Sequence, residues 1–226
     1  VYTVKFSITI EGEEFVFAKP VQYKFTDPVK GELYQKLVVY PSALIKATNS
    51  LLLFNDNNGK KANFVFSPQA NLKTKTSVSL NTSNGWKLNP DHGTFNLIKG
   101  QEYELSVDVK PEKFISGQIT YLQPSYTSNV SVGYNRQRLR KIDYDHIPTI
   151  TYFPDALTKL VAVDVKTVGK KIGYINGAGD FMPYCLQQLG YTVEFLKEED
   201  VTFEKLQQYD AVVTGIRAYN VHTWLS

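Results

Sequence analysis

The hydrophobic period of this chain changes towards its C-terminal end, and this change limits the folds that are open to it. From Val1 to about Gln123, apolar residues alternate with polar ones, as in the run from Val4 to Ile10. A period of two is typical of half-buried β-strands. From Lys171 onward, strand-like apolar runs are separated by segments with helical spacing. The sequence therefore predicts a mixed β and α/β protein, with the β region first.

Short candidate strands separated by turn-rich segments follow one another through the first region. They are Lys36–Tyr40, Ser50–Asn55, Lys61–Phe66, Ser77–Asn81, Gly93–Leu97, Glu102–Val109 and Ile115–Tyr121. Short strands at this spacing predict an immunoglobulin-like β-sandwich. The chain has one cysteine, Cys185, so the disulfide of antibody domains is excluded and aromatic residues must pack the core. Trp86 is expected to cover one end of that core, and stacking on a sugar is the alternative.

Turn-forming residues divide the chain into three expected parts. Asp27-Pro28 and Gly31 mark a junction between β units. We therefore assign 1–33 to the terminal strands of a preceding β module, 34–142 to the sandwich and 143–226 to the N-terminal part of an α/β domain. Because Ser226 falls within an apparent element, we expect the chain to be a piece of a longer protein.

The last part reads as strand, helix, strand, helix, strand. The expected strands are Lys171–Ile175, Tyr191–Leu196 and Ala211–Ile216, and the expected helices are Asp180–Leu189 and Val201–Tyr209 with Asp200 as an N-cap. Parallel strands joined by such crossovers begin a doubly wound sheet. The third strand is almost continuously apolar, as expected when helices cover both of its faces. Its open edge is expected either to pair with another chain or to be poorly ordered.

A glycine-rich turn follows the first of these strands. Gly177, Gly179 and Asp180 lie between a strand and a helix, where phosphate-binding loops are found. The dinucleotide fingerprint Gly-x-Gly-x-x-Gly is incomplete, because Met182 occupies the third glycine position. A tight turn with Asp180 capping the helix is therefore the favoured interpretation. Nucleotide binding is the alternative.

Arg217 and Asn220 follow the third strand and are expected at the same edge of the sheet as Asp180. The favoured interpretation is an ion pair between Asp180 and Arg217 that ties two loops together. The alternative is a ligand-binding crevice at the carboxyl ends of the strands. A catalytic site would also need a nucleophile and a base, and we assign no catalytic residue to this chain.

Other patterns narrow the function classes further. The net charge of +3 comes from interspersed acidic and basic residues, so the sequence predicts no nucleic-acid partner. The basic cluster at 136–141 alternates with other residues and predicts the solvent face of a strand, with a polyanion contact as the alternative. No apolar run has the length of a membrane span. His92, His146 and His222 lie far apart, so we predict no metal site.

Three runs carry a resemblance to a known family: residues 19–32, 172–180 and 209–220. They resemble the C-terminal part of large PIG-L/LmbE-type deacetylases of the Bacteroidetes kind, and the likeness extends from about Val1 to Asn220. In that family, an N-terminal domain binds zinc and removes the acetyl group from N-acetylglucosamine-type sugars. β-Sandwich modules follow it, and then a domain similar to class I glutamine amidotransferases.

The resemblance implies an accessory region without catalytic residues of its own. The family's zinc-binding His-Pro-Asp-Asp run does not occur in this sequence, and Cys185 does not match the amidotransferase cysteine. Zinc is thus expected in a deacetylase domain outside this chain, and that domain and carbohydrate are the expected partners. The family also implies a periplasmic or secreted location. The alternative is that the α/β region belongs to an amidotransferase-like hydrolase whose active site is completed by residues outside this chain.

Overall fold

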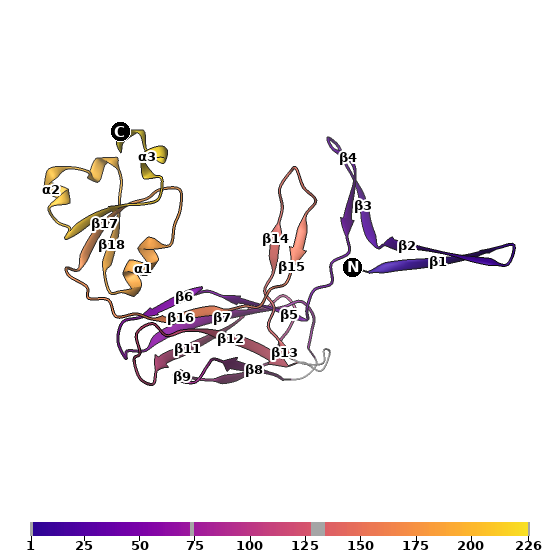
Figure 1. The fold of residues 1–226 in the computed structure, drawn as a ribbon, viewed down its shortest axis with the longest axis horizontal. Coiled ribbons are helices and arrows are strands. Elements are labelled where there is room, and N and C mark those ends of the chain that lie inside the picture. Colours follow the sequence, from indigo (N-terminus) through magenta and orange to yellow (C-terminus); the bar gives the residue numbers. More distant parts are fainter. Residues whose placement is uncertain (1, 73–74, 128–133, 226) are drawn as a thin grey trace.

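The computed structural model describes residues 2–72, 75–127 and 134–225. Figure 1 shows a β-sandwich that carries a small α/β unit above one end and several β-hairpins above the other. Strands dominate the fold, as the alternating first region predicts. No helix among these residues has the length and apolar character needed to cross a membrane.

Two sheets form the sandwich. The first has the strand order β5 (Ala43–Ala47), β7 (Lys60–Pro68), β11 (Tyr103–Pro111) and β9 (Trp86–Asn89). The second has the order β10 (His92–Phe95), β8 (Thr76–Asn81), β12 (Ile119–Thr127), β16 (Thr158–Ala162) and β6 (Leu51–Phe54), and β13 (Tyr134–Asn135) pairs with β12. The pairing of β16 with β6 is parallel, whereas the other pairings in both sheets are antiparallel.

Alternating side chains from both sheets fill the core. The largest fully buried ones are Ile45, Leu52, Phe54, Phe64, Phe66, Val78, Val107, Leu122, Tyr126 and Leu160, and Leu97 from the segment after β10 joins them. Burying an aliphatic or aromatic side chain of this size contributes about 1.5–3 kcal/mol. The buried phenol of Tyr126 also ties the sheets together, because it accepts from Ala43 N at 2.7 Å and donates to Ala43 O at 2.9 Å.

Several strand boundaries differ from the sequence-based expectation. Residues 37–40 form no strand, and β5 and β9 were not predicted. Residues 158–162 lie in the part assigned to the α/β domain, yet they form β16, which pairs with β12 and β6 of the sandwich. The reason is that Thr158, Leu160 and Ala162 alternate as buried residues, so this strand completes the sandwich core.

Among the residues that the structure describes, three two-stranded hairpins stand outside the sandwich. They are β1 (Thr3–Ile10) with β2 (Glu13–Pro20), β3 (Gln22–Asp27) with β4 (Gly31–Lys36), and β14 (Arg140–Ile142) with β15 (Ile150–Tyr152). Glu11 and Gly12 both have positive φ, as a tight turn between right-twisted strands requires. The junction expected at Asp27-Pro28 and Gly31 is itself the turn between β3 and β4.

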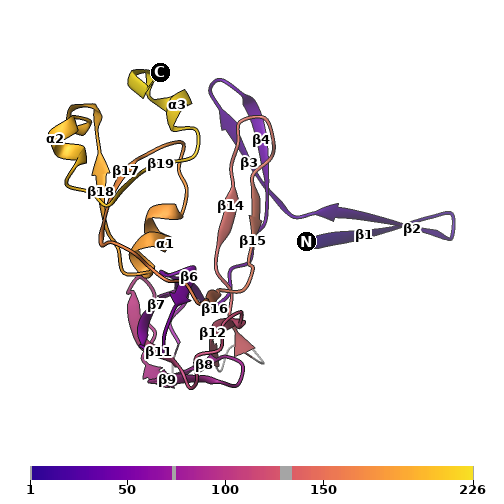
Figure 2. The same ribbon diagram turned by 60° about the vertical axis from the view of Figure 1, so that its left-hand side comes forward.

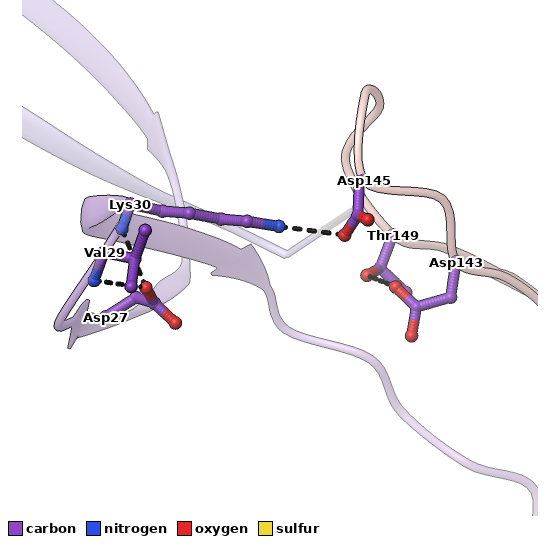
Figure 3. A network of polar contacts seen from close by, with 6 residues as sticks. All are labelled: Asp27, Val29, Lys30, Asp143, Asp145 and Thr149. Atoms are coloured by element: carbon purple, nitrogen blue, oxygen red, sulfur yellow. Dashed lines mark hydrogen bonds and ion pairs between the residues drawn. The ribbon is translucent and has the colours of Figure 1, made fainter.

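The tips of two hairpins are joined across the sequence. Figure 2 shows β3–β4 and β14–β15 rising beside each other, and in Figure 3 the ammonium group of Lys30 reaches Asp145 at 2.9 Å. At the tip of the β3–β4 hairpin, Asp27 Oδ1 accepts hydrogen bonds from the backbone N–H groups of Val29 and Lys30 and so shapes the turn between the two strands. Both partners of the ion pair are exposed, so it orients the hairpins more than it stabilises them.

The C-terminal unit contains a parallel three-stranded sheet in the order β18 (Thr192–Leu196), β17 (Lys171–Ile175) and β19 (Ala211–Thr214). The helical segments are α1 (Met182–Gln188), η1 (Glu198–Asp200), α2 (Phe203–Leu206), α3 (Ala218–Val221) and η2 (Thr223–Leu225). The expected N-cap Asp200 lies in η1, and Thr202 caps α2 instead by accepting from Lys205 N at 3.3 Å. The expected cover over both faces of the third strand is wrong, because most of β19 is exposed at the sheet edge.

Candidate functional site

Two loops meet at the carboxyl end of the parallel sheet, one after β17 and one after β19. Their backbones touch: a Cβ atom on Gly177 would lie 2.1 Å from Ile216 O, and one on Gly215 would lie 2.7 Å from Gly177 N. Ala178 N donates to Ile216 O at 2.9 Å across the same contact. Glycine is therefore required at both positions for the loops to approach this closely.

Asp180 is the polar centre of this contact. Its carboxylate accepts hydrogen bonds from the Tyr174 hydroxyl at 2.8 Å, from Met182 N at 2.9 Å and from Ile216 N at 3.0 Å. The hydrogen bond from Ile216 N, followed by those from Tyr174 and Met182, holds the pKa of Asp180 below its usual range. Burial and the adjacent carboxylate raise the pKa of Tyr174 to about 12.

The capping role expected for Asp180 is present in a modified form. The N-cap position of α1 is Phe181, and Asp180 stands one residue ahead of it while still bonding the first-turn N–H of Met182. The carboxylate also ties the loops together, as expected, but it does so through the backbone of Ile216. Among the described residues, no ion pair joins Asp180 to Arg217.

The side chains of Arg217 and Asn220 are exposed next to this contact, and so is Gly179 with its φ of +102°. Arg217 lies at the N-cap of α3 in the left-handed region, with φ 56° and ψ 26°. This conformation is uncommon for a residue with a side chain. The structure thus places Gly177, Gly179, Asp180 and Arg217 around one loop junction.

Two members of the junction were not singled out from the sequence. Tyr174 lies within β17, six residues before its partner Asp180, and an isolated tyrosine in an apolar strand gives no signal of a polar role. His222 Nε2 lies 2.7 Å from Asn176 O and so links the segment after α3 to the loop after β17. Spacing along the chain does not predict either contact.

The chemistry of the junction is that of a structural contact with an exposed polar rim. A carboxylate that accepts three hydrogen bonds and has a lowered pKa is a weak proton acceptor near neutral pH. Asn176, Arg217 and Asn220 supply exposed amide and guanidinium groups. Within the described residues, no three His, Cys, Asp or Glu side chains are grouped so as to hold a metal ion.

Trp86 lies far from this junction in the fold, in the core of the sandwich. It is 7% exposed, and its ring meets Phe54 edge-on with centroids 4.8 Å apart. Its indole Nε1 is buried and has no hydrogen-bond partner among the described residues. The ring thus covers the core, as the favoured interpretation predicted, and it offers no open face to a sugar.

Comparison with known proteins identifies distant structural likenesses. No family model matches the chain, and no curated protein matches it. A C. elegans MSP family member, WR4, is 10% identical with a TM-score of 0.31, and the match covers 53% of this chain and 98% of that one. The E. coli chaperone DraB is 8% identical with a TM-score of 0.33 and coverages of 54% and 57%. A family 123 glycoside hydrolase from Clostridium perfringens is 9% identical with a TM-score of 0.36 and coverages of 74% and 34%.

Proposed function

We propose that this chain is an accessory, non-catalytic region of a larger PIG-L/LmbE-type protein. In that protein, a zinc-dependent domain would deacetylate N-acetylglucosamine-type sugars, and this region would hold the domains in place and associate with carbohydrate. The observation that carries the proposal is the uncovered apolar face of the β1–β2 hairpin. It is the kind of surface that a module presents to an adjoining layer of the same protein.

The hairpin is apolar on one face and largely polar on the other. Cross-strand pairing places Phe6 opposite Phe17 and Ile8 opposite Phe15, so these residues share one face. The large apolar residues of that face are Val4, Phe6, Ile8, Ile10, Phe15 and Phe17, and each is 44–57% exposed. The opposite face carries Thr3, Lys5, Ser7, Thr9 and Glu14 beside Val16 and Ala18.

Such a hairpin needs a covering layer. An isolated two-stranded hairpin is only marginally stable in water. Packing its apolar face against further structure makes it stable. We assign the covering layer to the preceding β module of the larger protein, of which residues 1–33 would be the terminal strands. Glu13 and Lys19 lie at opposite ends of the apolar face, and they would form the polar rim of that interface.

The contact between the sandwich and the C-terminal unit supports a positioning role. The Tyr184 hydroxyl in α1 donates to Leu51 O of the sandwich at 2.9 Å and accepts from Asn49 Nδ2 at 3.3 Å. The Lys60 ammonium donates to Gln188 O at the C-terminal end of α1, where a cation is favourable. Burial lowers the pKa of Lys60. These contacts fix the orientation of α1 on the sandwich.

The parallel sheet of the C-terminal unit supports a second part of the proposal. The strand order of the parallel sheet is second, first, third in chain order, which is the order that begins a flavodoxin-like doubly wound domain. We interpret the unit from β17 to η2 as the first part of such an amidotransferase-like domain, and the sandwich as immunoglobulin-like. The exposed β19 edge would pair with the next strand of that domain in the complete protein.

One observation favours the second candidate function, an amidotransferase-like hydrolase completed by residues outside this chain. In doubly wound sheets, ligands bind where the strand order reverses, at the carboxyl ends of the strands. The loops after β17 and β19 meet at that point. A downstream nucleophilic cysteine with a histidine and a glutamate in the larger protein would support this candidate.

The test is deacetylation of N-acetylglucosamine derivatives with added zinc, measured for this chain and for the larger protein. We expect the larger protein to be active and this chain to be inactive. In the larger protein, Phe6→Asp with Phe17→Asp should lower the melting temperature, whereas Val29→Asp, at a 92% exposed turn position, should not. Turnover by this chain that Asp180→Asn abolishes would overturn the proposal.

A further inference from the structure

A shallow groove lies on the outer face of the sandwich, away from the junction of the two loops. Its lining residues are Asn81, Thr82, Ser83, Tyr121, Gln123 and Leu157, and its volume is about 380 Å³. This volume is within the range of small-molecule sites. None of these six side chains carries a formal charge, so the groove suits a neutral ligand.

Strand pairing explains why these side chains gather. On β12, Tyr121 and Gln123 point to one side of the sheet while Leu122 and Pro124 point into the core. Gln123 pairs with Asn81 of β8, so the two amide side chains lie on the same face of adjacent strands. Paired strands therefore supply Asn81, Tyr121 and Gln123, while Thr82 and Ser83 follow β8 and Leu157 precedes β16.

Gln123 is held in one orientation. Its Oε1 accepts from Arg136 Nη1 at 2.8 Å, and its Nε2 donates to Asp155 Oδ2 at 2.9 Å. A primary amide has two donor hydrogens and two acceptor lone pairs. The Gln123 amide therefore keeps one donor hydrogen and one acceptor lone pair for a ligand. Because the side chain is already ordered, binding through it loses little conformational entropy.

Tyr121 and Asn81 are the other two side chains that could contact a ligand in the groove. Tyr121 is 50% exposed, which leaves the ring accessible to a ligand in the groove. Asn81 Nδ2 donates to Ser125 Oγ at 3.4 Å. The side-chain oxygen Oδ1 of Asn81 has no hydrogen-bond partner within the described part of the chain. An aromatic ring beside oriented amides matches a pyranose sugar, which has an apolar C–H face and hydroxyl groups at its rim.

We propose that this groove binds a neutral saccharide, with Tyr121 packing against the sugar ring and the amides of Gln123 and Asn81 bonding its hydroxyl groups. The site replaces Trp86 as the carbohydrate contact of the sandwich. It deepens the carbohydrate association proposed above. Its test uses this chain by itself, so its failure is distinguishable from failure of the deacetylase assignment.

The experiment is an NMR titration of the chain with glucose, galactose, mannose and N-acetylglucosamine as separate probes. An open groove of this kind predicts a dissociation constant on the order of 1 mM for at least one probe. The shifted amides should cluster at 81–83, 121–123 and 157. Tyr121→Ala and Gln123→Leu should each weaken binding by about tenfold, equivalent to about 1.4 kcal/mol.

Tyr144→Ala is the matched control, because Tyr144 is 62% exposed at the tip of the β14–β15 hairpin. Its affinity for the sugar should equal that of the unaltered chain. Melting temperatures of all variants establish that loss of binding is not loss of folding. The proposal is overturned if no probe shifts these amides up to about 50 mM, far above a millimolar constant. It is also overturned if the shifts cluster elsewhere or if Tyr144→Ala weakens binding equally.

Discussion

The phenol of Tyr174 donates to the carboxylate of Asp180 at 2.8 Å and so joins the buried middle strand of the parallel sheet to the loop that follows it. The same carboxylate reaches Ile216 N in the loop after β19. One acidic side chain thus holds together a strand and the two loops that meet at its end.

Asp180→Asn should make the melting temperature depend less on pH in the acidic range. The pKa of Asp180 in the folded chain lies below its unfolded value of 3.8, so its stabilisation is present above that value and is lost as pH falls through the folded pKa. Below about pH 4, the melting temperature of the unaltered chain should therefore fall more steeply than that of the variant. Thermal melts by circular dichroism between about pH 2 and 7 measure this, over the range in which carboxyl groups titrate.

Asp164→Asn serves as the control, because no side-chain hydrogen bond or ion pair of Asp164 is present in the described part of the chain. Its pH curve should parallel that of the unaltered chain. Parallel curves for Asp180→Asn as well would contradict the role given to this carboxylate.

Gly177→Ala should destabilise the α/β unit more than Gly179→Ala does. A Cβ atom at 177 would lie 2.1 Å from the carbonyl oxygen of Ile216, so the two loops must separate, at a cost of about 3 kcal/mol. A Cβ atom at 179 meets nothing within 4 Å and is opposed by its positive φ, which costs about 1 kcal/mol. Urea denaturation of both variants compares the two costs, and equal losses would show that the loops do not touch as described.

The sequence predicts the positions of the strands better than it predicts which strands pair. Alternation locates β1, β7, β8 and β11, because each of these strands places apolar residues at every second position. It misses β9, which has four residues. It also assigns β16 to the wrong neighbours, since a short apolar strand carries no information on its partner. The convergence of Gly177 and Asp180 with the loop after β19 was predicted from topology, because parallel strands end at one edge.

The partner of Asp180 could not be predicted in the same way. The sequence offers Arg217 as the charged candidate, but the bond goes to the backbone N–H of Ile216. Backbone donors are present at every residue except proline, so sequence patterns do not single one out. Exposure of the hairpin face is likewise invisible in the sequence, because alternation marks an apolar face without showing what covers it.

Trp86→Phe should be tolerated, whereas Trp86→Ala should not. The buried indole Nε1 has no hydrogen-bond partner among the described residues, so phenylalanine removes a donor that makes no bond. Alanine leaves a cavity beside Phe54 and should cost about 3–5 kcal/mol. We expect Trp86→Phe to cost less than about 1.5 kcal/mol. A loss for Trp86→Phe that equals the alanine loss would indicate that the indole nitrogen does have a partner.

Tyr184→Phe should loosen the C-terminal unit on the sandwich. The change removes the hydroxyl that bonds Leu51 O and Asn49 Nδ2, and the net loss should be about 1 kcal/mol. Tyr191→Phe is the control, since the Tyr191 hydroxyl bonds Val168 O on the segment leading into the same unit. Small-angle X-ray scattering should show a broader distribution of dimensions for Tyr184→Phe than for Tyr191→Phe, and identical profiles would contradict the clamp.

The parallel pairing of β6 with β16 has a consequence for how the chain folds during synthesis. Leu51 pairs with Lys159, so the second sheet of the sandwich stays incomplete until residues far downstream have left the ribosome. Until then, β6 presents an unpaired, apolar edge to its surroundings. Contacts between such distant segments are slow to form, because a long loop must close before they are made. The nascent sandwich should therefore depend on chaperone protection through this interval.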